Sequence, residues 1–144
     1  MLSIKPKIVR EIANGEKTFE FRKKLLDITD PKNGIDNRIL IYTSSPDMQI
    51  SGSFTAKQFY CENFDDLMEK VQATDKYRAR IFNYFKHKNK CFAIKISDFK
   101  KYDSPLVLKY LRQQHNGFIP GQSYRYINKT DPIIEDIILK NGHL

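Results

Sequence analysis

The segment from Gly15 to Arg22 carries the residues best suited to chemistry in this sequence. It reads Gly-Glu-Lys-Thr-Phe-Glu-Phe-Arg and brings Lys17, Glu20 and Arg22 close together along the chain. The planar guanidinium of Arg22 can bind a phosphate or the edge of a base, and Glu20 can accept from an amino group or hold Arg22 in place. With Lys5 upstream, the set has three cations and one carboxylate, which is more charge than mutual neutralisation needs. The alternative is a surface ion pair between Glu20 and Arg22.

Hydroxyl and aromatic side chains elsewhere complete the candidate ligand-binding residues. They are Thr43, Ser44, Ser45, Ser123, Tyr124 and Tyr126. The two tyrosines offer faces on which an unstacked base can lie, a contact typically worth ~1 to 3 kcal/mol per base. Residues 43–45 follow a buried strand, where hydroxyls and unpaired backbone amides can bind an anion. The alternatives are tyrosines half-buried in the core and an ordinary turn ahead of the proline at position 46.

Two strands and a helix must position the charged residues. Apolar and polar residues alternate over 2–5 and again over 17–22, which predicts two short strands. In the second strand the phenylalanines face one side, and Thr18, Glu20 and Arg22 face the other, so we expect this polar row to be a presented surface. Between the two strands, a helix is predicted from Pro6 to the pair Asn14-Gly15, which favours a helix end.

The rest of the chain predicts a mixture of strands and helices in one domain spanning residues 1–144. Strands are predicted at 38–43, 49–60, 91–96 and 123–127, with a bulge at Gly52. Helices are predicted at 63–71, from a cap at Asp75, after Ser104-Pro105 to residue 111, and at about 131–141, with a loop at 27–37. The elements do not alternate regularly, so we expect an α+β fold with about six strands and a C-terminal helix packed on its barrel or sheet.

Charge is unevenly distributed along the chain. The 144 residues include 25 Lys plus Arg and 17 Asp plus Glu, for a formal net charge of +8. The surplus lies in residues 76–101, here called the basic stretch, where nine basic residues accompany a single acid. This pattern indicates either a footprint for a polyanion or a solvated lysine-rich face. In the helix predicted there, the spacing assigns Tyr77, Ile81, Tyr84 and Phe85 to the core and leaves Arg80 with its basic neighbours toward solvent.

Several classes of protein and site are disfavoured. No apolar run approaches the ~18 residues of a membrane span, and the apolar start of the chain is too short for a signal peptide. We therefore expect a cytoplasmic protein in which Cys61 and Cys91 are reduced. The three histidines share no metal-ligand spacing with each other or with the cysteines. Phosphate-loop, dinucleotide-binding and serine-hydrolase motifs are absent, so we expect neither a metal nor a cofactor.

The Gly15–Arg22 segment also carries a resemblance to a known family. Its Gly-x-Lys-x-x-Glu-x-Arg pattern, together with the blocks at 42–46, 52, 93–96 and 122–126, resembles the ASCH domain of the PUA-like superfamily, in order from Leu2 to about Ile127. The resemblance implies a small β-barrel flanked by helices. It also implies a cleft between barrel and helix that is suited to RNA or a nucleotide-like ligand.

Three functions remain open at this stage. The first is a module that binds RNA or a modified nucleotide in the charged cleft, with the basic stretch following a phosphate backbone. The second is a hydrolase with Lys17 and Glu20 as catalytic base and acid, because similar proteins include a ribonuclease-like branch and a branch that hydrolyses an acylated cytidine nucleoside. The latter branch has a threonine three residues after the lysine, where this chain has Glu20, so we expect ribonuclease-like chemistry to be the better fit. The third is a domain whose basic stretch meets an acidic protein partner.

Overall fold

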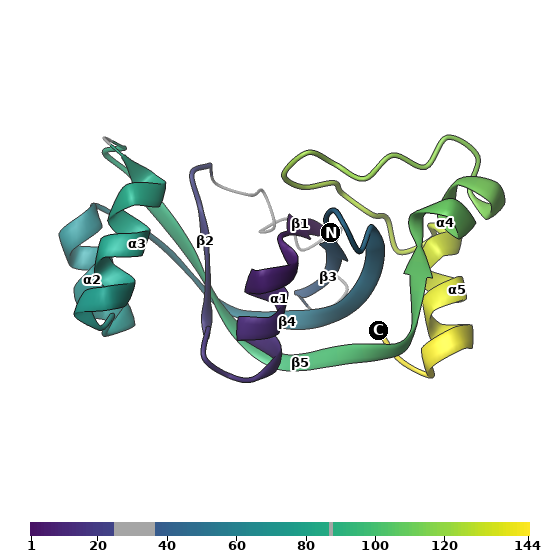
Figure 1. Ribbon diagram of the computed structural model, residues 1–144, viewed down its shortest axis with the longest axis horizontal. Coiled ribbons are helices and arrows are strands. Elements are labelled where there is room, and N and C mark those ends of the chain that lie inside the picture. The colour runs from purple at the N-terminus through teal and green to yellow at the C-terminus, as the bar shows by residue number, and fades with distance from the viewer. Residues whose placement is uncertain (25–36, 87) are drawn as a thin grey trace.

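The described part of the chain, residues 1–24, 37–86 and 88–144 of a computed structural model, forms an α+β fold (Figure 1). Its elements are β1 (Leu2–Ile4), α1 (Pro6–Ala13), β2 (Phe19–Arg22), β3 (Arg38–Thr43), β4 (Gln49–Glu62), α2 (Phe64–Val71), α3 (Asp75–Phe85), β5 (Cys91–Val107), α4 (Leu108–Gln114) and α5 (Pro132–Asn141). The strands make one mixed sheet in the order β1-β3-β4-β5-β2, in which only the β1–β3 pair is parallel. The predicted α+β class is confirmed.

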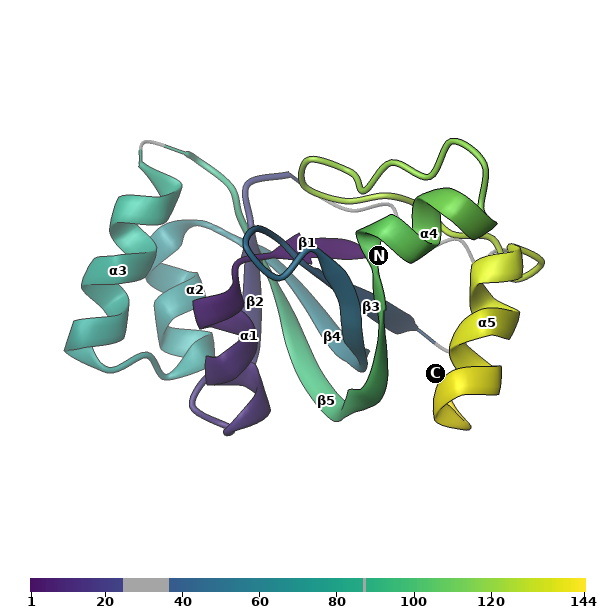
Figure 2. The same cartoon turned by 45° about the vertical axis from the view of Figure 1, so that its right-hand side comes forward.

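Three apolar clusters hold the helices against the long, curved strands β4 and β5 (Figures 1 and 2). One cluster joins α4 and α5 to the sheet and includes Leu111 and Ile137. A second packs α1 on the sheet through Ile12 and Phe54. A third lies under α2 and α3 and includes Phe85. Because α3 and α1 rest on different clusters, the space between them is not filled by a single core.

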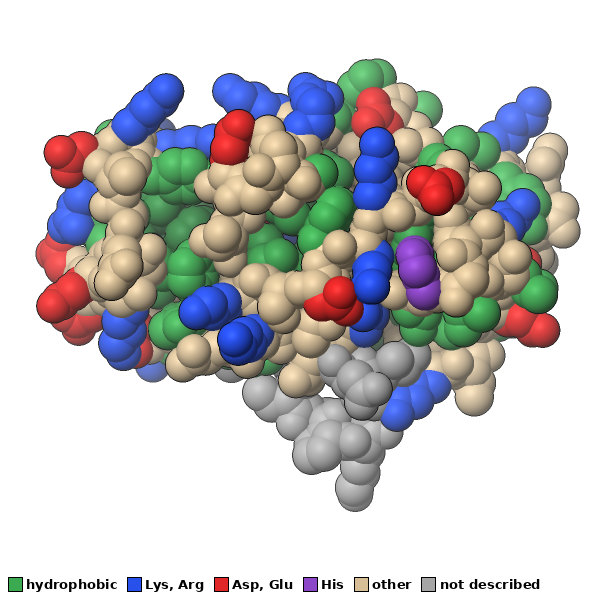
Figure 3. Space-filling view, turned by 90° about the horizontal axis from the view of Figure 1, so that it is seen from below, with side chains coloured by type: hydrophobic (Ala, Val, Ile, Leu, Met, Phe, Trp, Pro, Cys, Tyr) green, Lys and Arg blue, Asp and Glu red, His purple; other side chains and the backbone are tan. Residues whose placement is uncertain are grey.

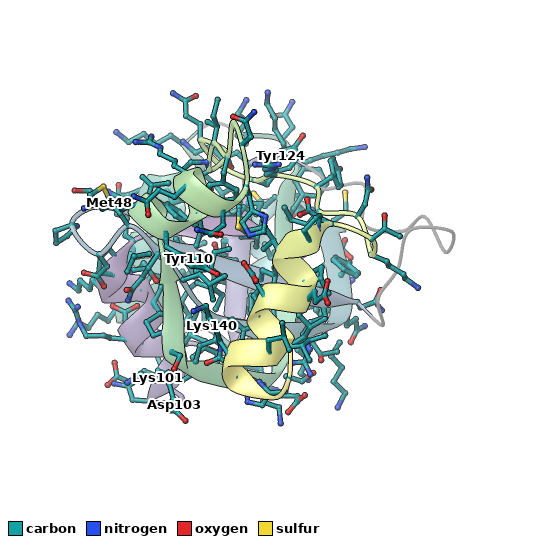
Figure 4. All side chains as sticks on the ribbon, turned by 90° about the vertical axis from the view of Figure 1, so that its right-hand side faces the viewer. Met48, Lys101, Asp103, Tyr110, Tyr124 and Lys140 are labelled. Carbon is teal, nitrogen blue, oxygen red and sulfur yellow. The ribbon has the colours of Figure 1, made fainter. Side chains whose placement is uncertain are left out.

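The helix α5 packs on the sheet and on α4 at one end of the molecule, as expected for the C-terminal helix. It begins at the cap Asp131, whose carboxylate accepts from the Ile133 amide at 3.0 Å. Tyr110 of α4 donates to Asp136 of α5 at 3.1 Å, and Lys140 lies 4.5 Å from the Tyr110 ring centroid (Figure 4). Within the described residues, no helix has the length and apolar character that crossing a membrane requires.

Strand β5 is much longer than the predicted strand at 91–96. It continues through Ser104-Pro105 to Val107, so the helix expected directly after that pair begins only at Leu108. Its pairing with β4 shifts register in three places, and those shifts interrupt the alternation from which strands are recognised. The bulge predicted at Gly52 is confirmed, because the register shifts between Ile50 and Gly52. A Cβ atom on Gly52 would lie 2.4 Å from the Lys100 carbonyl oxygen, so this approach requires glycine.

A closed barrel of about six strands is not confirmed, because the sheet of the described residues is open between its edge strands β1 and β2. The strand predicted at 123–127 is wrong: the segment makes one isolated bridge, between Tyr124 and Leu2. It lies beside β1 through the bonds from the Ser3 amide to the Ser123 carbonyl at 3.0 Å and from the Arg125 amide to the Met1 carbonyl at 2.9 Å. Beyond that bridge the segment has no regular secondary structure.

The remaining helix boundaries follow the sequence with small shifts. Helix α1 ends before Asn14-Gly15 as predicted, and α2 begins after the cap Asn63, which accepts from the Asp66 amide. The N-cap of α3 is Thr74, one residue before the predicted Asp75. The loop predicted at 27–37 lies outside the described residues except for its last position, so its prediction stays open.

Candidate ligand-binding cleft

A cavity of about 350 Å3 opens between the edge strands β1 and β2 and the helices α1 and α3. Figure 1 shows β2 between α3 and α1 in that view. Four predicted site residues line the cavity, namely Lys5, Lys17, Glu20 and Arg22. The structure therefore brings together residues from the β1–α1 junction and from β2, as the sequence predicted. Four further lining residues come from α3, and sequence analysis did not include them in the site.

Glu20 is the centre of an ion network inside the cleft. Its Oε1 lies 2.9 Å from Nη2 of Arg22, and its Oε2 lies 3.2 Å from Nζ of Lys17. The exposed fractions of Lys17, Glu20 and Arg22 are only 7, 6 and 8%. The expectation of a presented polar row is therefore wrong, because α1, α3 and residues 121–125 cover this face of β2. The same burial excludes a surface ion pair as the account of Glu20 and Arg22.

Thr18 is separated from the other members of the predicted polar row. It precedes β2, is exposed, and lines a different cavity of about 140 Å3 together with Phe19 and residues 71–74. Its carbonyl accepts from the Ile96 amide at 2.9 Å, which fixes the backbone there. The alternation of the segment breaks at this position because regular strand geometry begins only at Phe19.

Lys17 is held at the floor of the cleft. Its Nζ donates to the Phe19 carbonyl at 2.5 Å and lies 4.8 Å from the centroid of the Phe21 ring. Burial lowers the pKa of Lys17 below the ordinary value of 10.5, although the Glu20 carboxylate beside it acts in the opposite direction. A buried amine with a lowered pKa next to a carboxylate is a pair that can exchange protons with a ligand.

We expect the Lys17 amine to titrate below 10.5, and Lys70 to titrate above it. At Lys17 the effect of burial on the pKa outweighs the opposite effect of Glu20. Lys70 is exposed and donates to Glu62, which raises the pKa of Lys70. Side-chain NMR of isotopically labelled lysine, assigned with Lys17→Arg and Lys70→Arg, measures both pKa values. Equal titration of the two amines would contradict the buried position of Lys17.

Arg22 joins the two open edges of the sheet. Its Nη1 donates to the Ser123 carbonyl at 3.2 Å and to Ser123 Oγ at 3.1 Å, and its Nη2 lies 3.4 Å from the Ser3 carbonyl. The Nε of Arg22 is buried and has no hydrogen-bond partner among the described residues. Ser123 is thus linked to the cleft through Arg22. The Arg22 side chain connects the edge strands β1 and β2, which are not paired with each other in the sheet.

The helix α3 contributes a face that sequence analysis assigned to core and solvent. Tyr77, Arg80 and Tyr84 all line the cleft. Arg80 pairs with Glu11 of α1, with its Nη1 at 2.9 and 3.0 Å from the two carboxylate oxygens. Burial raises the pKa of Glu11, but the hydrogen bonds and charge of Arg80 outweigh it and hold that pKa below its ordinary value. Arg80 is therefore directed to the cleft mouth and not simply to solvent.

The other predicted binding residues do not line this cleft. Thr43 is buried and bonded to Ser51 Oγ at 2.5 Å, and the Ser44 amide donates to the Ile4 carbonyl. Tyr124 and Tyr126 are exposed and pack edge to face, with ring centroids 5.5 Å apart (Tyr124 is labelled in Figure 4). Their ligand contacts, and those of Ser45, stay predictions. Among the described residues, no group of three or more His, Cys, Asp or Glu side chains is placed to hold a metal ion.

The basic stretch is divided by the fold. Arg80 lines the cleft, Arg78 pairs with Asp65, and Lys100 pairs with Asp98. On the face shown in Figure 3, Lys and Arg side chains are spread among other residues and do not gather in one patch. Of these three residues of the stretch, Arg80 lies at the cleft, whereas Arg78 and Lys100 pair with carboxylates outside its lining.

The fold is similar to that of solved ASCH proteins. The crystal structure of ASCH from Zymomonas mobilis is 23% identical, has a TM-score of 0.72, and matches over 89% of this chain and 86% of that chain. Crystal structures of a serine-to-alanine and a tyrosine-to-phenylalanine variant of the same protein are each 22% identical, with TM-scores of 0.71 and 0.72, over 89% of this chain and 87 or 88% of those chains. No family model and no curated protein matches the sequence. The predicted resemblance to ASCH is confirmed at the level of the fold.

Proposed function

We propose that this domain, which has the fold of an ASCH protein, binds RNA or a nucleotide-like ligand in the cleft between β1, β2, α1 and α3. The observation that carries the proposal is the buried network of Lys17, Glu20 and Arg22. Glu20 supplies one negative charge beside two cations, and the exposed Lys5 adds a third cation at the cleft. The resulting positive potential favours an anionic ligand.

The size of the cavity supports a small binding unit. About 350 Å3 lies near the lower end of the range of ~300 to 1,000 Å3 that is usual for small-molecule sites. Its wall combines the charged groups with aromatic and aliphatic side chains such as Phe21, Ile4 and Ile8. A base or nucleoside unit has this mixture of apolar faces and polar edges, so one unit of an RNA strand is a suitable occupant. The remaining basic stretch would attract the rest of the strand.

We expect Lys5→Ala to weaken the binding of single-stranded RNA several-fold at low salt. Lys5 is exposed, so its removal takes away a cation at the cleft without disturbing the buried network. Fluorescence anisotropy with a labelled RNA measures the affinity, and thermal melting checks the fold. Lys57→Ala is the matched control, since Lys57 is exposed on β4 and does not line the cleft. Absence of binding to the unaltered protein at low salt, or equal effects of the two changes, would overturn the proposal.

A hydrolase that uses the same cleft is the second candidate function. Burial lowers the pKa of Lys17 against the opposing effect of Glu20, and a lowered pKa favours an amine that acts as a base with Glu20 as its proton partner. The separate position of Thr18 weighs against a threonine nucleophile and thus against acylcytidine amidohydrolase chemistry. Incubation with labelled RNA and with acylated nucleosides distinguishes turnover from retention. Cleavage of RNA that disappears in Lys17→Met while RNA binding persists would favour the hydrolase.

A further inference from the structure

One face of helix α3 lies along the cleft and takes no part in the ion pairs of Glu20 with Lys17 and Arg22. Tyr77, Arg80, Ile81 and Tyr84 follow the spacing i, i+3, i+4 and i+7, which places them on one side of a helix. All four line the cavity. Ile81 is buried in the apolar cluster under α3, whereas Arg80 and Tyr84 are exposed. The stripe is thus anchored at its centre and open at the two residues that can contact a ligand.

Resting on the proposed function, we propose that this α3 stripe selects a nucleotide: Tyr84 stacks on the base, and Arg80 binds the phosphate of the same nucleotide. A nucleoside without phosphate, or a phosphate without a base, then fills only half of the site. The ligand class is a nucleoside monophosphate or one nucleotide of a single strand.

Arg80, in contrast to Arg22, retains donors for a ligand. Both terminal nitrogens of Arg22 are engaged with Glu20 or with oxygens of Ser3 and Ser123, and its Nε is buried. Among the residues that the structure describes, Arg80 forms hydrogen bonds through Nη1, which donates to both carboxylate oxygens of Glu11. A guanidinium has five N–H donors, so Nη2 and Nε of Arg80 stay available. Since the Arg80 side chain is 43% exposed, a phosphate can reach them without breaking the pair with Glu11.

Tyr84 stands close to the charged network and presents an accessible ring. It is 40% exposed and lines the cavity. Burial raises the pKa of the Tyr84 hydroxyl above its ordinary value, and of the two nearby charges Arg22 lowers that pKa and Glu20 raises it. The Lys23 amine lies 5.0 Å from the ring centroid, and the Phe85 ring packs edge to face against Tyr84 at 5.1 Å, so a base that stacks on the Lys23 side must displace that amine. Arg80 and Tyr84 are one helical turn apart, about 6 Å along the axis, which suits the base and phosphate of one nucleotide.

The test compares 5′-nucleoside monophosphates, the corresponding nucleosides and inorganic phosphate as probes, titrated into the full chain and followed by NMR or calorimetry. We expect the unaltered protein to bind at least one monophosphate about tenfold more tightly than its nucleoside. Arg80→Gln should abolish that preference. Tyr84→Ala should weaken the binding of both the monophosphate and its nucleoside about tenfold, in the range expected for loss of stacking. Tyr84→Phe should bind like the unaltered protein, because the ring persists.

Glu11→Gln separates ligand contact from a structural role of the ion pair. Both Arg80→Gln and Glu11→Gln break the Arg80–Glu11 pair, but only the first removes the guanidinium. We expect Glu11→Gln to keep or increase the preference for the monophosphate. Equal loss in both variants, an unchanged preference in Arg80→Gln, or no binding of any monophosphate overturns the inference. If RNA binding still depends on Lys5 in that case, the proposed function stands without it; if RNA does not bind either, both fail.

Discussion

Glu20→Gln is expected to lower the free energy of unfolding by about 3 kcal/mol or more, because it leaves two buried cations without their shared carboxylate. Lys17 and Arg22 lie 3.2 and 2.9 Å from the Glu20 oxygens, and all three side chains are at most a tenth exposed. The glutamine keeps the volume and one acceptor but removes the charge. Urea denaturation followed by circular dichroism measures the change, with an unaltered slope showing that both proteins unfold in the same way.

The control for this prediction is an ion pair of the same chemistry at the surface. Glu62→Gln breaks the pair with Lys70, which is largely solvated, so the denaturation midpoint should hardly move. A double-mutant cycle with Lys17→Met should give less destabilisation than the sum of the single changes, since the methionine removes one of the two stranded charges. Equal midpoints for Glu20→Gln and Glu62→Gln would mean that the cleft is more hydrated than its geometry indicates.

The same variant should show a particular pH dependence. Lys17 has a folded-state pKa below the ordinary value of 10.5, so between those two values the unfolded chain binds more protons than the folded one. Stability from this group therefore rises with pH across that interval. Removing the Glu20 charge lowers the pKa of Lys17 further and widens the interval. The destabilisation of Glu20→Gln should thus shrink as pH rises from neutral toward 10.5.

Local elements were predictable where side-chain periodicity and helix-end signals agree. The strand Arg38–Thr43 is a continuous apolar run and has the predicted bounds, and α5 has both the aspartate cap and the terminal glycine. The length of β5 was not predictable, because three register shifts in its pairing with β4 interrupt the alternation from which a strand is recognised. The open sheet was equally unpredictable, since the partner of an edge strand depends on tertiary packing. Residues 121–125 lie at that edge through backbone bonds and through the side chains of Ser3 and Arg22.

The candidate site was likewise predictable only in its local features. The Gly-x-Lys-x-x-Glu-x-Arg pattern identified the residues of the charged network, because the pattern itself lies within one short segment. Their burial depends on α3, which is more than fifty residues away in the sequence, so alternation alone suggested an exposed row. Tyr77 and Tyr84 have the spacing of ordinary core residues. Their face of α3 lines the cleft because α1 lies beside the same cavity, and this tertiary arrangement is not visible in the sequence. The signal that sequence analysis passed over was Arg80, a cation within an otherwise apolar and aromatic stripe.

Gly121→Ala should lower the free energy of unfolding by about 3 kcal/mol and loosen Arg22 at the same time. A Cβ atom on Gly121 would lie 2.0 Å from the Tyr124 carbonyl oxygen, so the turn at 121–124 must open. The opening breaks the bond from Ser3 Oγ to the Gly121 carbonyl, at 2.5 Å, and strains those that join Ser3 and Arg22 to Ser123. Each such bond contributes about 1 kcal/mol, which gives the expected total.

The consequence for the cleft distinguishes this effect from a general loss of stability. With Ser123 displaced, the Arg22 guanidinium keeps Glu20 and the Ser3 carbonyl but loses its two bonds to Ser123, so its side-chain N–H signals should shift and exchange faster with water. Gly117→Ala is the matched control: Gly117 has a φ of 72° but no atom within 4 Å of its Cβ position. Gly117→Ala should lower the free energy of unfolding by about 1 to 2 kcal/mol, because alanine is strained in the left-handed backbone conformation. It should leave the Arg22 signals in place. Unchanged Arg22 signals in Gly121→Ala would show that Glu20 and the Ser3 carbonyl fix the guanidinium without Ser123, and that residues 121–125 cover the cleft without organising it.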